Sequence, residues 1–248
     1  MGPISHGTPT NGTPTNGTPT QGTPMAALPR VVAIGFNKCA TRSLAQLFAR
    51  SGHAAVHQKL PRRRGWGGRR KLGGIMRANV EAGRPVLAGV EEFVFYGDLI
   101  DSNQRESFDG NTLFREVMRD YPDTILLLNW RDREAWIRSR LRHGHGEFAA
   151  REQRLRRLPS LDALCAVWRH DWETHLAAVR AFMADRPDQL VEFHLERDPV
   201  QKLVDRLSAY GLQADHFDDI GRSRDVSQPA WLLACKTWIA QHRPRTQR

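Results

Sequence analysis

The sequence predicts an α/β domain in which helices cover both faces of a central, mostly parallel β-sheet, a three-layer α/β/α architecture. Short apolar runs rich in branched side chains, such as residues 31–34 and 124–129, are typical of strands buried on both faces. Each run is followed by a polar turn and then by apolar residues at helical spacing. This alternation of strand and helix is the pattern of a parallel sheet with crossover helices.

Composition sets the limits of that domain in a chain of 248 residues. Residues 1–29 repeat a Gly-Thr-Pro unit with few apolar side chains, so we expect a disordered tail there. The folded domain is expected over residues 30–242, with a basic tail at 243–248. No segment resembles a secretory signal or a membrane span, and the three cysteines are widely spaced. These features together indicate a cytoplasmic protein.

The clearest chemistry lies at residues 34–44, where an apolar strand meets Gly35, a polar turn and the start of a helix. Strand, tight turn and helix in that order point backbone N–H groups and the helix dipole at one spot, which suits a phosphate. Lys38 adds a positive charge, and Thr41 and Ser43 add hydroxyl groups. The spacing differs from a Walker A motif, so this loop is not built for a magnesium nucleoside triphosphate. The alternative is a purely structural turn with a solvated Lys38.

Candidates for proton transfer stand near predicted strand ends. His57 ends a short strand expected at residues 53–57, at the carboxyl edge where open α/β sheets bind ligands. Glu91 and Glu92 follow a third strand expected at residues 86–90, and Glu92 is favoured because alternate strand residues face opposite sides. The alternatives are a structural histidine and an exposed acidic pair.

A second anion site is predicted after the strand at residues 124–129. Arg131 stands at its end, and Ser139 lies about two turns into a helix that begins near Glu134, with Asp132 as its N-cap. The arginine fork matches a phosphate, and Ser139 adds a hydroxyl. Two anion sites on neighbouring strand ends predict a ligand with two separated phosphates.

The remaining segments are less specific. Residues 61–71 hold six cations and three glycines, which indicates a mobile basic lid, an RNA-binding arm or a solvated loop. A long helix with a core-packing face is expected at residues 161–185. A strand at 190–193, a helix at 199–210 and a last helix at 230–241 complete the expected order.

Taken together, the motifs resemble the sulfotransferase family that uses 3′-phosphoadenosine-5′-phosphosulfate (PAPS). The segment Phe36-Asn37-Lys38-Cys39-Ala40-Thr41-Arg42-Ser43 is similar to that family's 5′-phosphosulfate loop. Trp130-Arg131-Asp132, with Ser139 eight positions after Arg131, resembles its 3′-phosphate motif. The resemblance implies a P-loop-NTPase-like sulfotransferase fold and metal-free transfer of SO₃ from PAPS, leaving 3′,5′-adenosine bisphosphate (PAP).

The same resemblance implies roles for residues. Lys38 would neutralise the bridging oxygen of the leaving phosphate, and a general base would be Glu92, Glu91 or His57, in that order. Ala40 replaces the glycine common in this loop, so we expect it to avoid positive φ. The residues that would hold the cofactor are Asn37, Lys38, Cys39, Ala40, Thr41, Arg42, Ser43, Arg131 and Ser139.

The acceptor is expected to be a hydroxyl or amine on a carbohydrate or lipid-linked molecule. The formal net charge of +10 and the basic residues 61–71 favour an anionic glycan or lipid headgroup. One competing hypothesis is another P-loop transferase, such as a small kinase, although the strand end after Leu128 carries no aspartate to hold magnesium. The other is a basic nucleic-acid-binding protein, which would need a continuous basic face with aromatic platforms.

Overall fold

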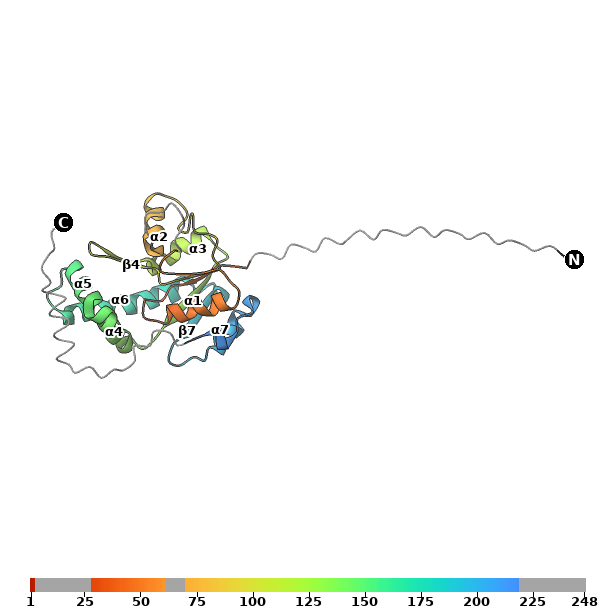
Figure 1. Ribbon diagram of the computed structural model, residues 1–248. Helices are drawn as coiled ribbons and strands as arrows, with labels where there is room; N and C mark the ends of the chain where they lie inside the picture. Colours follow the sequence, from red (N-terminus) through yellow and green to blue (C-terminus); the bar gives the residue numbers. More distant parts are fainter. Residues whose placement is uncertain (3–27, 61–69, 219–248) are drawn as a thin grey trace.

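The computed structural model describes residues 1–2, 28–60 and 70–218, and its centre is a five-stranded parallel sheet (Figure 1). Every neighbouring pair of strands in this sheet is parallel. An α/β fold with helices flanking a parallel sheet is therefore confirmed. The strands, in spatial order, are β2 (Ala55–His57), β3 (Phe95–Gly97), β1 (Val31–Ala33), β6 (Ile125–Trp130) and β7 (Leu190–His194).

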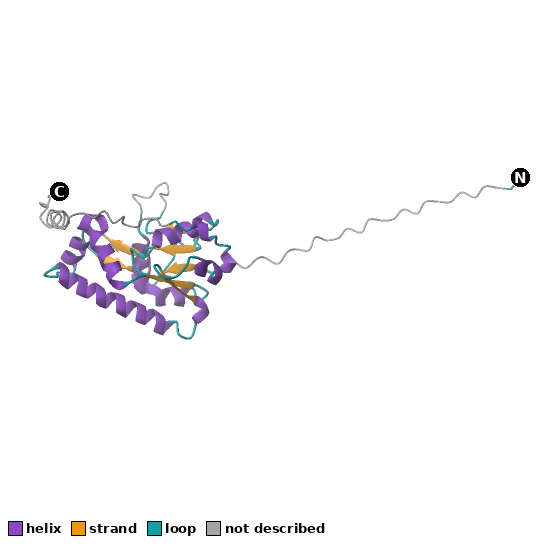
Figure 2. Ribbon diagram, turned by 90° about the horizontal axis from the view of Figure 1, so that it is seen from below, coloured by secondary structure: helices purple, strands orange, loops and turns teal. Residues whose placement is uncertain are grey.

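Helices cover both faces of the sheet, as Figure 2 shows. Alternate strand residues enter two apolar clusters, one on each face. One cluster contains α1 (Thr41–Arg50) and α7 (Gln201–Arg206). Five helices contribute to the other cluster: α2 (Leu72–Glu81), α3 (Phe114–Asp120), α4 (Arg133–Arg142), α5 (Glu147–Leu155) and α6 (Leu161–Phe182).

A small antiparallel hairpin, which the sequence did not suggest, follows β3. It consists of β4 (Ile100–Ser102) and β5 (Ser107–Asp109), and it packs against α2. A Cβ on Gly73 of α2 would lie 2.0 Å from the carbonyl oxygen of Leu99, so only glycine allows this close approach. Short 3₁₀ turns complete the described chain: Gly110–Leu113, His143–Gly146, Pro187–Gln189, Ser208–Tyr210 and Ala214–His216.

The prediction of a strand at residues 86–90 is wrong. Val86 and Leu87 are buried in the core, but this segment forms turns, in which the Ala88 N–H donates to the Pro85 carbonyl at 2.9 Å. Gly89 has a φ of 80°, which a strand ladder does not accommodate. The third strand along the chain is instead β3.

Most other elements lie where they were expected. Helix α1 follows the polar turn as expected, and Asp132 caps α4 by accepting a hydrogen bond from the Ala135 N–H at 2.9 Å. The expected tail at 1–29 falls mostly outside the described residues, as do most of the basic segment 61–71, the helix at 230–241 and the tail at 243–248. Within the described residues, no helix is long and apolar enough to cross a membrane.

Candidate functional site

The loop between β1 and α1 has an unusual backbone. Lys38 has a φ of 70° and Ala40 a φ of 58°, both in the left-handed region. The expectation that Ala40 avoids positive φ is therefore wrong. Each non-glycine residue in this region costs about 1–2 kcal/mol, and such residues persist where the surrounding contacts fix the chain.

Those contacts come mainly from the strand beside β1. The Asn129 side chain accepts a hydrogen bond from the Gly35 N–H at 3.0 Å and donates one to the Cys39 carbonyl at 2.6 Å. The Trp136 indole N–H donates to the Asn37 carbonyl at 3.0 Å. A Cβ on Gly35 would lie 1.8 Å from the Asn129 carbonyl oxygen, so the strand packing requires glycine there. Asn129 thus clamps both ends of the loop.

The start of α1 is arranged to receive an anion. Its N-cap residue, Ala40, supplies no side-chain cap, and its first turn holds no acidic residue. Thr41 and Ser43 are buried in this turn, while Arg42 is exposed. Lys38 is half-buried, and burial together with the neighbouring charge of Arg42 lowers the pKa of its ammonium group. Lys38 and Arg42 therefore concentrate positive charge beside the helix start.

On one side of this loop, the structure places a histidine and an aspartate from neighbouring strand ends. His57 Nε2 lies 3.1 Å from Thr41 Oγ1 and 3.5 Å from Asp98 Oδ2. Asp98 directly follows β3, and its side chain is 12% exposed. Among the described residues, Asp98 Oδ1 has no hydrogen-bond partner. The position predicted for His57 at the carboxyl edge is confirmed.

Burial changes the ionisation of both groups. It raises the pKa of Asp98 to about 7, with a further increase from the negative charge of Asp109. Burial and the nearby Arg42 lower the pKa of His57 to about 4. Near neutral pH, His57 is uncharged and Asp98 is poised between its two forms. A carboxyl group with that property beside a lysine is a strong candidate for proton transfer.

Asp98 is the functional candidate that the sequence analysis missed. Its sequence signal is an aspartate two positions after the apolar residues 93–96, with Gly97 between them. Glu92 and Glu91 were chosen because they follow residues 86–90, but they precede β3 and so lie at the amino edge of the sheet, opposite the loop. The Glu91 side chain accepts a hydrogen bond from the Tyr121 hydroxyl at 3.3 Å. Their predicted placement at a carboxyl strand end is wrong.

On the other side of the loop lies Arg131, directly after β6. Strands β1 and β6 are neighbours, so Arg131 and Lys38 stand at the same edge of the sheet, and the positive charge of Arg131 helps to lower the pKa of Lys38. Arg131 Nε donates to Glu196 Oε1 at 2.7 Å, and the Asp132 N–H donates to Glu196 Oε2 at 3.2 Å. Ser139 is half-buried in α4. Glu196, which no sequence pattern indicated, holds Arg131 in place.

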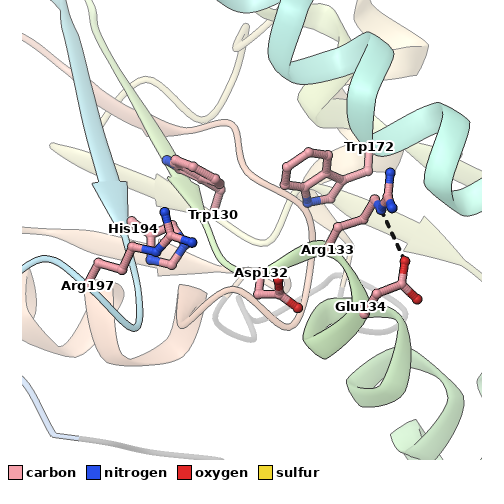
Figure 3. A pocket seen from close by; sticks show the side chains of 7 residues that line it. All are labelled: Trp130, Asp132, Arg133, Glu134, Trp172, His194 and Arg197. Carbon is pink, nitrogen blue, oxygen red and sulfur yellow. Dashed lines mark hydrogen bonds and ion pairs between the residues drawn. The ribbon is translucent and has the colours of Figure 1, made fainter.

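A cavity of about 270 Å³ opens near the carboxyl ends of β6 and β7 (Figure 3). The rings of Trp130 from β6 and Trp172 from α6 face it, and His194 enters from the end of β7. His194 is buried, its Nδ1 accepts a hydrogen bond from the Glu196 N–H at 3.3 Å, and its Nε2 has no partner among the described residues. The other lining residues are Asp132, Arg133, Glu134 and Arg197.

The loop cysteine takes no part in this chemistry. Cys39 is 2% exposed, and burial raises the pKa of its thiol to about 12. A thiol of that kind stays protonated at neutral pH and is a poor nucleophile. Cys39 therefore fills space under the loop.

Comparison of the sequence with models of known protein families finds no match, and comparison with curated proteins finds none either.

Proposed function

We propose that this protein is a sulfotransferase that moves a sulfuryl group from PAPS to a hydroxyl or amine acceptor. The observation that carries the proposal is the order of three groups along the carboxyl edge of the sheet. Lys38 follows the central strand β1, Arg131 follows β6 on one side, and Asp98 follows β3 on the other. Lys38 thus lies between an arginine that is suited to binding a phosphate and a carboxyl group that can take up a proton.

The residues present fit a cofactor with two separated phosphates. The uncapped start of α1, with the hydroxyls of Thr41 and Ser43 and the charge of Arg42, would hold the 5′-phosphosulfate. Arg131 and Ser139 would hold the 3′-phosphate. PAPS supplies an activated sulfuryl group when it is bound. Because Arg131 is bonded to Glu196 in the protein alone, its guanidinium is oriented before any anion arrives.

Each polar side chain then has a distinct task. Lys38 places a positive charge where the leaving phosphate gains negative charge, which is the kind of stabilisation that acts in a transition state. Asp98 accepts the proton of the acceptor hydroxyl or amine, because its pKa of about 7 lies close to neutral pH. His57, uncharged at that pH, bridges Thr41 and Asp98 and holds the carboxyl group in place. Asp98 therefore replaces Glu92 and Glu91 as the proposed base.

A carbohydrate or lipid-linked acceptor remains part of the proposal. It depends on the basic residues 61–71, of which only Arg70 and Lys71 are among the described residues. A cytoplasmic location is proposed on the cysteine pattern, and Cys39 and Cys165 are both free thiols.

Calorimetric titration of the full chain with PAP, AMP and magnesium-ATP tests the cofactor. We expect PAP to bind at micromolar concentration, AMP to bind much more weakly, and Arg131→Ala to weaken PAP binding by about 100-fold. Arg119→Ala is the matched control, because Arg119 on α3 is an arginine that is paired with a carboxylate, Asp120, and does not line the cavity. Preference for magnesium-ATP would favour a kinase. Binding of nucleic acid with none of the three nucleotides bound would favour a nucleic-acid-binding protein.

A further inference from the structure

The wall of the cavity at the carboxyl ends of β6 and β7 holds two hydrogen-bond donors that the protein does not use. His194 is 5% exposed, and its Nε2 has no partner among the described residues. Its Nδ1 accepts a hydrogen bond from the Glu196 N–H at 3.3 Å, so the proton of the neutral ring is on Nε2. The indole Nε1–H of Trp172 is also buried without a partner in the described chain. Buried donors are almost always bonded, so this pair indicates a ligand that accepts hydrogen bonds.

Aromatic rings form much of the same wall. The ring centre of Trp130 lies 4.4 Å from that of His194 and 5.9 Å from that of Trp172, at interplanar angles of 83° and 62°. Because the rings meet at these steep angles, they form a corner rather than a stack, and the indoles face the cavity (Figure 3). The volume of about 270 Å³ is below the roughly 300–1,000 Å³ of sites for drug-sized ligands. The cavity therefore suits a ligand of a single ring.

The charged residues that line the cavity differ in how far their charges are compensated. Glu134 accepts two hydrogen bonds from Arg169 at 2.9 Å each, and it also pairs with Arg133. Asp132 caps α4, where the helix dipole favours its negative charge. Arg197, by contrast, is exposed and has no ion pair with any described residue. The group that still needs an opposite charge is therefore a cation.

We propose that this cavity binds a small ligand that consists of one six-membered ring carrying a carboxylate. The ring would lie against the indole faces, and the carboxylate would accept hydrogen bonds from His194 Nε2–H and Trp172 Nε1–H. Arg197 would supply the opposite charge. One uncompensated cation matches one negative charge, so a carboxylate is favoured over a dianionic phosphate. The inference stands apart from the proposed function, since no residue that would hold PAPS lines the cavity.

Two kinds of molecule have this chemistry, and NMR titration of the full chain without PAP distinguishes them. Benzoate represents aromatic carboxylates, and glucuronate represents sugar rings with a carboxylate. We expect at least one of them to bind with a Kd of about 1 mM or tighter and to shift the indole N–H signal of Trp172. The loss of that signal in Trp172→Phe assigns it. The probe that binds more tightly identifies the kind of ring.

Two further probes separate the ring from the charge. Acetate has the carboxylate without a ring, and benzyl alcohol has a ring without a charge. Both should shift the Trp172 signal much less than the carboxylated ring does. The proposal is overturned if neither benzoate nor glucuronate shifts the signal at about 10 mM, or if acetate or benzyl alcohol binds as tightly as they do.

Arg197→Gln tests the charge without disturbing the core, because Arg197 is exposed and has no ion pair with a described residue. We expect the affinity for the bound probe to fall by about 10-fold or more. Arg186→Gln is the matched control: Arg186 is also exposed and without such an ion pair, but it precedes β7 and lines a different cavity. An equal loss of affinity in both variants would contradict the role of Arg197.

A competition titration separates this site from the proposed cofactor site. We expect PAP to leave the affinity for the carboxylate probe unchanged. Displacement of the probe by PAP would place the cavity within the nucleotide site and overturn the inference of a separate one. Failure of the chain to bind PAP would remove the proposed function and leave the probe result intact.

Discussion

His57 Nε2 lies 3.5 Å from Asp98 Oδ2, across the ends of the neighbouring strands β2 and β3. Burial shifts their pKa values in opposite directions, to about 4 for His57 and about 7 for Asp98. Between pH 4 and 6.5, the folded pair holds one proton, on Asp98. The unfolded pair also holds one, on His57. Folding therefore exchanges the proton between the two residues without changing their total.

The first prediction concerns how stability depends on pH. From pH 4 to 7, Asp98 binds its proton only in the folded protein, so its contribution to the free energy of unfolding falls as pH rises. From pH 4 to 6.5, His57 is protonated only in the unfolded protein, so its contribution rises with pH. In Asp98→Asn only the His57 contribution remains, and we expect stability to rise by about 3 kcal/mol across that range. Urea unfolding at several pH values measures this slope.

At pH 8 the same variant should be more stable than the wild type. The wild-type protein must bury an ionised Asp98 there, and the full pKa shift corresponds to about 4 kcal/mol. Asparagine retains part of the cost of burying a polar group, so we expect a gain of about 1–3 kcal/mol. Asp123→Asn, in an exposed turn, is the control and should change stability little. A destabilised Asp98→Asn at pH 8 would contradict the assignment of Asp98 as a costly buried carboxylate.

The sequence predicted those parts of the fold that depend on residue patterns within a short stretch of the chain. The apolar run of β6 and the switch from strand to helix period after Lys38 both gave correct elements. Residues 86–90 have the same apolar character as a strand but form turns, because strand formation depends on a partner that lies elsewhere in the chain. Strand β3 has such partners, since the Val31 N–H donates to the Val94 carbonyl at 2.7 Å.

The candidate site likewise combines residues that short-range patterns predict with residues that only long-range contacts reveal. The loop residues and the edge position of His57 could be predicted, because they follow from short-range patterns. The Asn129 clamp, the Glu196 contact with Arg131 and the closeness of Asp98 to His57 depend on contacts between distant segments. A single sequence holds no pattern for such contacts. Asp98 could not be chosen before the correct third strand was known.

A second prediction concerns the left-handed backbone of the loop. Ala40 has a φ of 58°, so Ala40→Gly removes the Cβ that disfavours this conformation. We expect a gain in stability of about 1 kcal/mol, because the relief of strain exceeds the added entropy of the unfolded chain. The midpoint of thermal unfolding should rise by about 2–4 °C.

Ala166→Gly is the matched control for that variant. Ala166 is exposed within α6, where glycine costs about 1 kcal/mol. The two substitutions make the same chemical change and should shift the unfolding midpoint in opposite directions. A loss of stability in Ala40→Gly would mean that Ala40 is not strained in the folded protein.

A third prediction concerns the side chain that clamps the loop. Asn129→Ala removes two buried hydrogen bonds, one from the Gly35 N–H and one to the Cys39 carbonyl. Leaving those groups without partners should cost about 2–4 kcal/mol. Since the loop then loses its fixed shape, PAP binding should weaken by about 10-fold or more. Asn103→Ala, in the exposed turn of the hairpin, should cost less than about 1 kcal/mol and leave PAP binding unchanged. Equal effects of the two substitutions would contradict the role of Asn129.

The last prediction separates the role of Lys38 from simple anion binding. Lys38 lies between Arg131 and Asp98 along the sheet edge. In the proposed sulfotransferase, its charge would act on the reacting bond, whereas Arg131 would hold the distal phosphate. Lys38→Ala should slow the breakdown of PAPS to PAP, the transfer to water, by about 100- to 1,000-fold. It should weaken PAP binding much less than Arg131→Ala does.

Two variants make that comparison decisive. Lys202→Ala removes a lysine of α7 that is paired with Asp198 at 2.8 Å, and it should leave both PAPS breakdown and PAP binding unchanged. Arg131→Ala should weaken PAP binding by about 100-fold while the rate at saturating PAPS falls less. If Lys38→Ala weakened PAP binding as much as Arg131→Ala and kept the full rate at saturation, Lys38 would hold the cofactor without acting on the transfer. The order Asp98–Lys38–Arg131 along the sheet edge would then be a binding arrangement only.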